Sequence, residues 1–266
     1  MEAPGCYAIW CARSGRLFHT DGAAMQLRAW TPASGQHRSW RLPEPLHCFA
    51  LTASRERLLL GLASRLAFLD LNTGLLAPVC DIAPGTRPSD GRCDRQGRFV
   101  FGTAGVETSA RGGFWRLDHD LSLERLPLGD CDHATGICFS PNGRTLYYAD
   151  ASAPGIRRCD YHPCSGEITR PRVFADVAAG AAAVDADACL WIAQEGRGQL
   201  RRIAPDGSVE RVLALDAPRA GWPVFGGPGL ETLYVPAGGG EVFSAYRTGV
   251  RGLAEERFLG RLPSRA

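Results

Sequence analysis

The chain has 266 residues, of which 45% are hydrophobic and 22% charged, and its formal net charge is +2. This composition excludes a disordered protein and a nucleic-acid-binding protein recognised by its charge. No apolar run reaches the roughly 18 residues of a membrane helix, and the start, Met-Glu-Ala-Pro-Gly, lacks the pattern of a secretory signal. We therefore expect a cytoplasmic protein with no membrane or nucleic-acid partner.

Two residue types narrow the chemistry further. All 30 basic residues are arginine, so a Schiff-base lysine and a P-loop lysine are both excluded. None of the ten cysteines forms a C-x-x-C pair, which excludes zinc ribbons and thioredoxin-type motifs. In a reducing cytoplasm we expect free thiols.

A short apolar strand behind a turn recurs along the whole chain. Successive copies lie 41 to 47 residues apart and are centred on Leu17, Leu58, Phe99, Leu146, Leu190 and Leu233. A cluster of Asp, Ser, Thr or Gly, typical of a hairpin turn, follows each copy, as at Ser34-Gly35 and Asp206-Gly207. This regular spacing indicates a repeat architecture.

Each repeat contains the pattern of a four-stranded meander. A small apolar strand such as GICFS is followed by a turn, an aromatic-rich strand, a third strand and an amphipathic strand such as SVERVLAL. No segment keeps a period of 3.6 residues, so long helices are excluded. Six repeats of four strands predict an all-β, six-bladed β-propeller with four-stranded antiparallel blades, as a single domain over residues 1–266. Because little chain precedes Cys6, strand counting predicts that residues 256–262 supply the outer strand of the last blade.

Four segments are specific enough to indicate a family: SDGRCDRQGRFVFGT, FSPNGRTLYYAD, VDADACLWIAQ and FGGPGLETLYV. In this order and spacing they resemble the regucalcin, gluconolactonase and luciferin-regenerating-enzyme family over essentially the whole chain. The resemblance implies a six-bladed propeller, a divalent cation such as Ca, Zn or Mn in the central channel, and hydrolysis of sugar or related lactones.

The resemblance also assigns three metal-binding positions, and all three are changed. The family's Glu, Asn and Asp fall on Cys6, Thr135 and Gly180. A hard cation prefers oxygen ligands, which Gly180 lacks and Thr135 supplies only as a neutral hydroxyl. We therefore expect no metal cofactor, although Cys and His on the same ring leave zinc open.

Substrate-binding positions follow partly from the resemblance and partly from the predicted blade starts. Arg87 and Glu107 match family residues that contact substrate, and Ser89 replaces a family Asn. The remaining candidates lie at the starts of blades four and six and are His133, Thr135 and Trp222.

The starts of three consecutive blades also carry a possible catalytic set. Cys6, His47 and Asp90 should converge near the axis as nucleophile, base and orienting carboxylate. A neighbouring imidazole would lower the pKa of the thiol. Each also has a structural interpretation, namely a packed small residue, a channel-lining polar group and a turn-capping carboxylate.

The sequence thus predicts an enzyme that hydrolyses a lactone or ester-like small molecule in the channel without the usual metal. Two alternatives stay open. One is an inactive propeller that binds a small molecule. The other is an orthodox metal-dependent sugar lactonase in which Glu2 is the missing ligand and the alignment of the first blade is shifted. The sequence leaves the oligomeric state open.

Overall fold

The computed structural model describes residues 6–21, 24–107, 109–194, 197–215, 221–237 and 242–261. Its strands form six antiparallel sheets, numbered here as blades 1 to 6 in chain order. Blades 1 to 3 consist of β1 (Ala8–Cys11), β2 (Arg16–Asp21), β3 (Gln26–Thr31), β4 (Gln36–Arg41), β5 (Leu46–Leu51), β6 (Arg57–Leu62), β7 (Arg65–Asp70), β8 (Leu76–Asp81), β9 (Thr86–Cys93), β10 (Phe99–Gly105), β11 (Phe114–Leu117) and β12 (Leu123–Arg125). Blades 4 to 6 consist of β13 (Ala134–Phe139), β14 (Thr145–Asp150), β15 (Pro154–Tyr161), β16 (Ile168–Ala178), β17 (Ala182–Val184), β18 (Leu190–Gln194), β19 (Gln199–Ile203), β20 (Val209–Ala214), β21 (Val224–Gly226), β22 (Thr232–Ala237) and β23 (Val242–Arg247).

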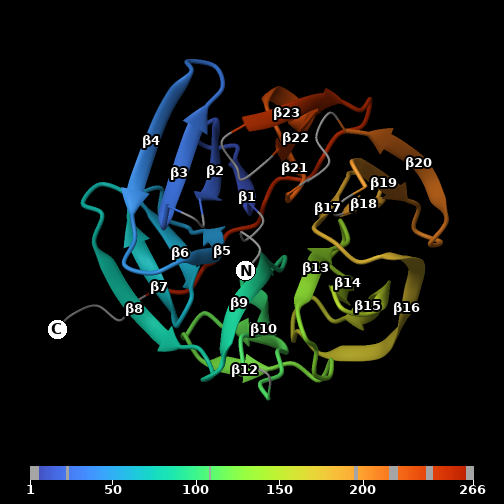
Figure 1. Ribbon diagram of the computed structural model, residues 1–266, viewed down its shortest axis with the longest axis horizontal. Coiled ribbons are helices and arrows are strands. Elements are labelled where there is room, and N and C mark those ends of the chain that lie inside the picture. Colours follow the sequence, from blue (N-terminus) through green and yellow to red (C-terminus); the bar gives the residue numbers. More distant parts are fainter. Residues whose placement is uncertain are drawn as a thin grey trace.

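The six sheets surround a common centre, with the first strand of each blade innermost (Figure 1). Neighbouring inner strands contact one another around the ring, as β5 contacts β9 and β9 contacts β13. The prediction of a six-bladed β-propeller is confirmed. The only helix among the described residues is the short η1 (Pro228–Leu230), and no described helix is long and apolar enough to cross a membrane.

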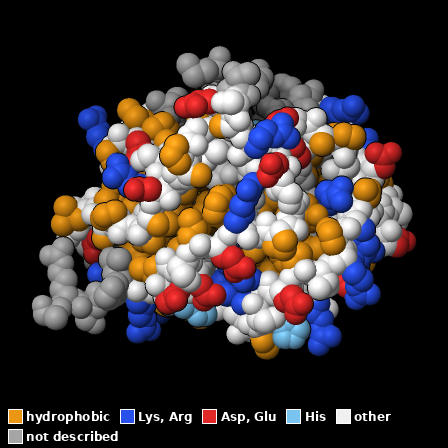
Figure 2. All heavy atoms as spheres, turned by 90° about the horizontal axis from the view of Figure 1, so that it is seen from below, with side chains coloured by type: hydrophobic (Ala, Val, Ile, Leu, Met, Phe, Trp, Pro, Cys, Tyr) orange, Lys and Arg blue, Asp and Glu red, His pale blue; other side chains and the backbone are white. Residues whose placement is uncertain are grey.

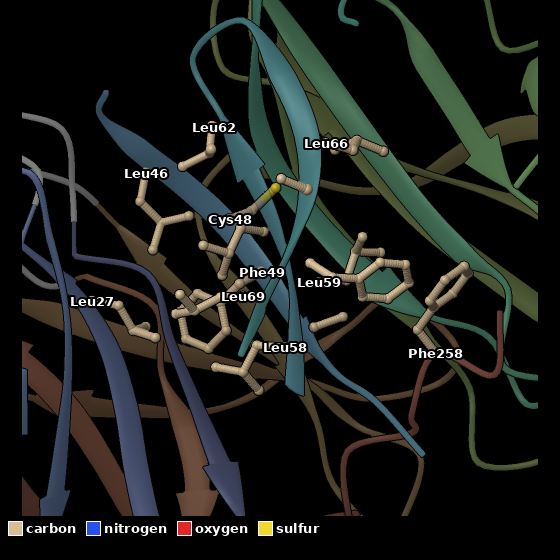
Figure 3. Close-up of a cluster of buried hydrophobic side chains, with 14 of the residues drawn as sticks. Leu27, Leu46, Cys48, Phe49, Leu58, Leu59, Leu62, Leu66, Leu69 and Phe258 are labelled. Atoms are coloured by element: carbon tan, nitrogen blue, oxygen red, sulfur yellow. The ribbon is translucent and has the colours of Figure 1, made fainter. Parts of the chain in front are cut away.

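The apolar strands predicted from the repeats form the core between the blades. In β6 the sequence RLLLGL buries every residue after the first, and Leu59, Leu60 and Leu62 are fully buried. Successive residues of a strand point to opposite faces, so Leu59 and Leu60 pack on opposite sides of blade 2. In Figure 3, Leu59 lies on the side of Phe258, while Phe49, Leu58 and Leu69 lie on the side of Leu27 of blade 1. Burial of each such side chain contributes about 1.5–3 kcal/mol, so these contacts hold neighbouring blades together.

The prediction that residues 256–262 close the last blade is wrong. Phe258 forms a parallel bridge with Thr52 of blade 2, and its N–H donates to the carbonyl of Leu51 at 2.8 Å. Its ring is fully buried, lies 6.0 Å from that of Phe68, and packs on the side of blade 2 that carries Leu59 (Figure 3). Burial of this ring, which strand counting does not consider, fixes the C-terminal segment. Among the described residues blade 6 has three strands, and residue 262 lies outside them.

The C-terminal segment instead crosses one end of the channel. Gly252 bridges Asp185 of blade 5 and donates its N–H to Leu230 of blade 6. Further along, Glu255 pairs with Arg92 at 3.4 Å and Glu256 with Arg95 at 2.8 Å, both on blade 3. In Figure 1 this red segment passes across the centre toward blade 2. It covers the end at which the inner strands finish, and the other end, where these strands begin, is called here the mouth.

The edge of the ring is chemically mixed. Seen from the side, positive and negative side chains alternate with exposed apolar ones over the outer strands (Figure 2). This interspersed pattern matches the balanced formal charge of the chain.

Candidate functional site

The mouth is formed by the residues that begin the inner strands. His47 and Arg87 are the second residues of β5 and β9, and His133 directly precedes β13. All inner strands run in the same direction around the ring, so these three side chains from blades 2, 3 and 4 lie on one arc of the mouth. Each is half-buried, which leaves it accessible to a small molecule.

The closest polar contact on this arc joins Arg87 to His47. The Nη1 of Arg87 lies 3.1 Å from the Nδ1 of His47. Burial, together with the charge of Arg87 and the proximity of His133, lowers the pKa of His47 to about 4. The imidazole is therefore neutral at neutral pH. Because Arg87 can only donate, Nδ1 accepts and the proton of His47 resides on Nε2. The pair presents a cation and an N–H donor.

His133 is held on the same arc by its backbone. Its N–H donates to Asp150 Oδ1 at 3.1 Å, its carbonyl accepts from Ala151, and it bridges Ala104 of blade 3. Its imidazole is close enough to His47 to contribute to the lowered pKa of that residue. Three groups able to interact with substrate oxygens thus occupy one side of the mouth.

Glu107 lies at the rim, beside the loop that leads to Arg87. A Cβ built on Gly85 would lie 3.3 Å from the Oε2 of Glu107, and the N–H of Val106 donates to the carbonyl of Gly85. The side chain of Glu107 is exposed. This carboxylate therefore lies at the mouth end of the channel.

Cys6 is beside a different histidine from the one expected. Its Sγ lies 3.9 Å from the Nδ1 of His19, on the second strand of the same blade. The residue is 4% exposed, and burial and the charge of Asp21 raise the pKa of its thiol to about 12. Burial also lowers the pKa of His19 to about 4. At neutral pH this is a neutral thiol beside a neutral imidazole, not a thiolate–imidazolium pair.

Asp90 is fully engaged in structural hydrogen bonds. Its Oδ1 accepts from the N–H of Gly91 at 2.7 Å and from the indole of Trp222 at 3.1 Å, and its Oδ2 accepts from the N–H of Ile137 at 2.9 Å. The carboxylate is 1% exposed, and burial raises its pKa. It connects blades 3, 4 and 6. The residues of the expected set Cys6, His47 and Asp90 are therefore held by three separate groups of partners.

Trp222 crosses the channel below the mouth. Besides its bond to Asp90, its ring lies 5.5 Å from that of Tyr7, whose hydroxyl donates to the carbonyl of Gly91. Blades 1, 3 and 6 are thereby joined across the axis. These aromatic side chains span the axis, and the region on their mouth side, beside His47, Arg87 and His133, is called here the bowl.

Ser89 and Thr135 lie within the junction of blades 3 and 4. Ser89 Oγ donates to the carbonyl of Ala134 at 2.7 Å and the residue is buried. Thr135 pairs with Ala149 and is also buried. Both side chains support the wall of the bowl and offer little surface to a ligand.

The three positions that the family resemblance assigns to a metal do not fit a hard divalent cation. Cys6 is a buried thiol, Thr135 has a neutral hydroxyl, and a Cβ added to Gly180 would lie 2.0 Å from the carbonyl oxygen of Ala193. Within the described ranges, no three His, Cys, Asp or Glu side chains are grouped so that they could hold a metal ion. Glu2, the ligand of the alternative alignment, lies outside those ranges.

Three buried residues of the channel were missed from the sequence. His19, Tyr7 and Arg92 all lie in or beside the inner layer, and Arg92 donates to the hydroxyl of Tyr7 and the carbonyl of Ala182. The one available signal was a histidine inside the apolar strand GRLFHTD. Arg92 carries no such signal, because its partners come from blades 1 and 5 and from the C-terminal segment.

Comparison with known proteins identifies the family of this chain. Residues 6–238 match the family model described as SMP-30/Gluconolactonase/LRE-like region. The chain belongs to this family. It is 41% identical to an L-arabinolactonase of Azospirillum brasilense over 75% of this chain and 70% of that protein. It is 30% identical to a 6-deoxy-6-sulfogluconolactonase of Pseudomonas putida over 95% and 94%.

Solved structures show the same fold. A luciferin-regenerating enzyme superposes with a TM-score of 0.89 at 18% identity, covering 97% of this chain and 95% of that one. The calcium-binding protein regucalcin of Agrobacterium tumefaciens gives 0.88 at 22% identity, covering 98% and 94%. The family resemblance inferred from the sequence is confirmed.

Proposed function

We propose that this protein hydrolyses a lactone bound in the bowl at the mouth against Arg87 and His47, and that it needs no divalent cation. Membership of the lactonase family and the two lactonase relatives support the reaction class. The 3.1 Å contact between Arg87 and His47 is the observation that carries the site. The substrate is a small molecule, and the ten free thiols support a reducing, cytoplasmic setting.

The pair has the chemistry to stabilise the charge that develops during lactone hydrolysis. Water adds to the carbonyl carbon and negative charge collects on the carbonyl oxygen. The remaining N–H groups of Arg87 would donate to this oxygen and bind the oxyanion more strongly than the neutral carbonyl, while the Nε2–H of His47, which points away from Arg87, would donate to another oxygen of the lactone. Because burial has already removed much of the surrounding water, these donors act in a medium of reduced dielectric.

His133 is the group that we assign to proton transfer. As the water attacks, His133 would accept its proton, and when the ring C–O bond breaks it would return this proton to the departing alkoxide. The net reaction converts one lactone and one water into one hydroxy acid. The half-buried position of His133 on the same arc as His47 supports this assignment.

The chemistry of the donors supports metal independence. Calcium and manganese need several oxygen ligands, and zinc needs deprotonated sulfur, imidazole or carboxylate. Cys6 holds its proton, Gly180 has no side chain and Thr135 has only a hydroxyl. Arg87 supplies in their place a fixed positive charge that no chelator removes.

One observation favours a second candidate, a propeller that binds a small acid without turnover. Asp90, the only acidic residue expected in the catalytic set, is fully occupied by hydrogen bonds, and Glu107 is exposed at the rim. An arginine and two histidines without a free carboxylate also describe a carboxylate-binding site.

A lactone panel with and without chelator separates these functions. L-arabinolactone, gluconolactone and simple aliphatic and aromatic lactones are followed by a pH indicator before and after treatment with EDTA. We expect turnover of at least one lactone to be unchanged by EDTA. Turnover abolished by EDTA and restored by calcium would refute metal independence, and saturable binding of the hydroxy acid without any turnover would favour the second candidate.

A further inference from the structure

A second cavity lies at the opposite end of blades 1 and 2 from the mouth. It measures about 110 Å³ and is bounded by the β1–β2 turn, the β5–β6 turn and the C-terminal segment. Strand β5 connects the two sites, because His47 stands near its beginning and Leu51 at its end lines the cavity. At about 3.3 Å per residue the two ends are about 13 Å apart. The cavity is therefore separate from the bowl.

The floor of this cavity is apolar. It is made of side chains from β1, β2, β5, β6 and the residue after β7, namely Cys11, Phe18, Leu51, Leu58 and Leu71. Phe18, Leu51, Leu58 and Leu71 are buried, and they belong to the core seam between blades 1 and 2. Such a floor favours a ligand with an apolar body.

The rim of the same cavity is strongly cationic. Five arginines line it and no acidic residue does: Arg13, Arg16, Arg55, Arg57 and Arg257. In the part of the chain that the structure describes, Arg13 donates to the carbonyl of Ala53 at 2.9 Å and Arg57 acts on the carboxylate of Asp70. Arg16, Arg55 and Arg257 have no ion pair among the described residues. Five guanidinium groups around one opening repel each other unless an anion is present.

The apolar floor and the cationic rim together indicate the class of ligand. We infer that this cavity binds a small organic anion whose carboxylate or phosphate group lies among the arginines while its apolar body rests on Phe18 and the leucines. An apolar cavity of about 150 Å³ accommodates benzene, so about 110 Å³ that opens to solvent fits a single ring or a short chain. Arginine binds carboxylate and phosphate with paired N–H donors, so both head groups are included.

Binding of simple probes tests this inference without any lactone. Benzoate and phenyl phosphate carry the two head groups, and benzamide has the shape of benzoate without its charge. We expect ligand-observed NMR or calorimetry to show that each anion binds at least tenfold more tightly than benzamide. We also expect the affinity to fall as salt is raised, because the attraction is electrostatic.

Matched variants locate the binding. The double variant Arg16→Gln/Arg257→Gln removes two rim charges and should weaken benzoate binding at least tenfold. Arg41→Gln/Arg144→Gln removes the same charge from exposed positions elsewhere and should leave binding unchanged. Arg87→Gln, in the bowl, is the control for anions bound there, and should leave unchanged the benzoate binding that Arg16→Gln/Arg257→Gln removes. If the first double variant fails to fold, the single variant Arg55→Gln, at an exposed rim residue, makes the same test.

Three results would overturn the inference. They are equal binding of benzoate and benzamide, retention of benzoate affinity in the rim variants, and loss of binding in Arg87→Gln. Absence of any benzoate or phenyl phosphate binding at millimolar concentration would overturn it too, and would leave the arginines as a contact for acidic side chains of another protein. None of these outcomes depends on the proposed lactonase activity, so the two proposals fail separately.

Discussion

Replacing Phe258 by alanine should destabilise the whole propeller, although the residue lies close to the end of the chain. Its ring is 0% exposed and packs 6.0 Å from the ring of Phe68 of blade 2, a residue far from it in the sequence. Removing a buried phenylalanine ring costs about 3–5 kcal/mol through lost transfer energy and the cavity left behind. For a chain somewhat longer than 200 residues each kcal/mol lowers Tm by about 2–4 °C, so the expected shift is about 6–20 °C.

Differential scanning calorimetry measures this shift, with Leu259→Ala as the matched control. Leu259 is the next residue in the same segment, and it is 46% exposed, so its truncation should cost less than about 1 kcal/mol. Equal Tm values for the two variants would refute the reasoning, because they would mean that Phe258 is not part of the core and that the C-terminal segment is not anchored on blade 2.

Three further predictions concern residues around the channel. The buried, neutral His19 should make the protein less stable as pH falls from about 6.5 to about 4, because in this window the unfolded state binds a proton that the folded state does not. In urea titrations, His19→Gln should reduce this decline in unfolding free energy by up to about 3 kcal/mol. An unaltered decline would contradict the burial argument. Gly180→Ala should lower the unfolding free energy by about 1–3 kcal/mol, because its Cβ would lie 2.0 Å from the carbonyl of Ala193. The control Ala178→Ser, at an exposed position nearby, should have almost no effect. Equal denaturant midpoints for the two variants would show that the backbone around Ala193 shifts to accept the methyl group. Cys6→Ser should retain lactone turnover within about threefold, because a thiol with its pKa at about 12 supplies no nucleophile at neutral pH, and abolished turnover in a variant with unchanged Tm would restore the nucleophile hypothesis.

The blade architecture was predictable because each repeat contains the strand and turn patterns that define one blade. The apolar core strands, as in RTLYYAD, and the turn residues that follow, as at Ser165-Gly166, are local in the sequence, and each recurs at the interval of one blade. Six such units leave few alternatives to a closed ring. The path of the C-terminal segment was not predictable in this way, because it depends on the burial of one side chain, Phe258, against residues about 190–210 positions earlier in the chain.

The sequence predicted which residues lie at the mouth more accurately than it predicted the contacts between their side chains. The register of the repeats placed His47, Arg87 and Trp222 at the same end of the propeller, and the structure places them there. The register of the repeats does not determine which neighbouring side chain a residue contacts. Cys6 meets His19 because the second strand of its own blade is closer than the next blade, and Asp90 is surrounded by backbone N–H groups that no sequence pattern reports.

The glycines illustrate the same limit. The sequence places Gly180 at a family ligand position, where its lack of a side chain predicts the loss of a metal ligand. The structure adds that the carbonyl of Ala193 occupies the space that a Cβ would need. A close approach of two backbone segments is a property of the folded ring, and neither composition nor spacing reveals it.

The measurement that tests the central claim most directly is the kcat/KM of Arg87→Gln on the best lactone of the panel, in EDTA, beside that of Arg41→Gln. The account predicts a loss of about 10²–10³-fold for Arg87→Gln, the usual effect of removing one donor to an oxyanion, and no change for Arg41→Gln. An Arg87→Gln protein that retains full metal-independent turnover would contradict the assignment of the Arg87–His47 pair as the catalytic site.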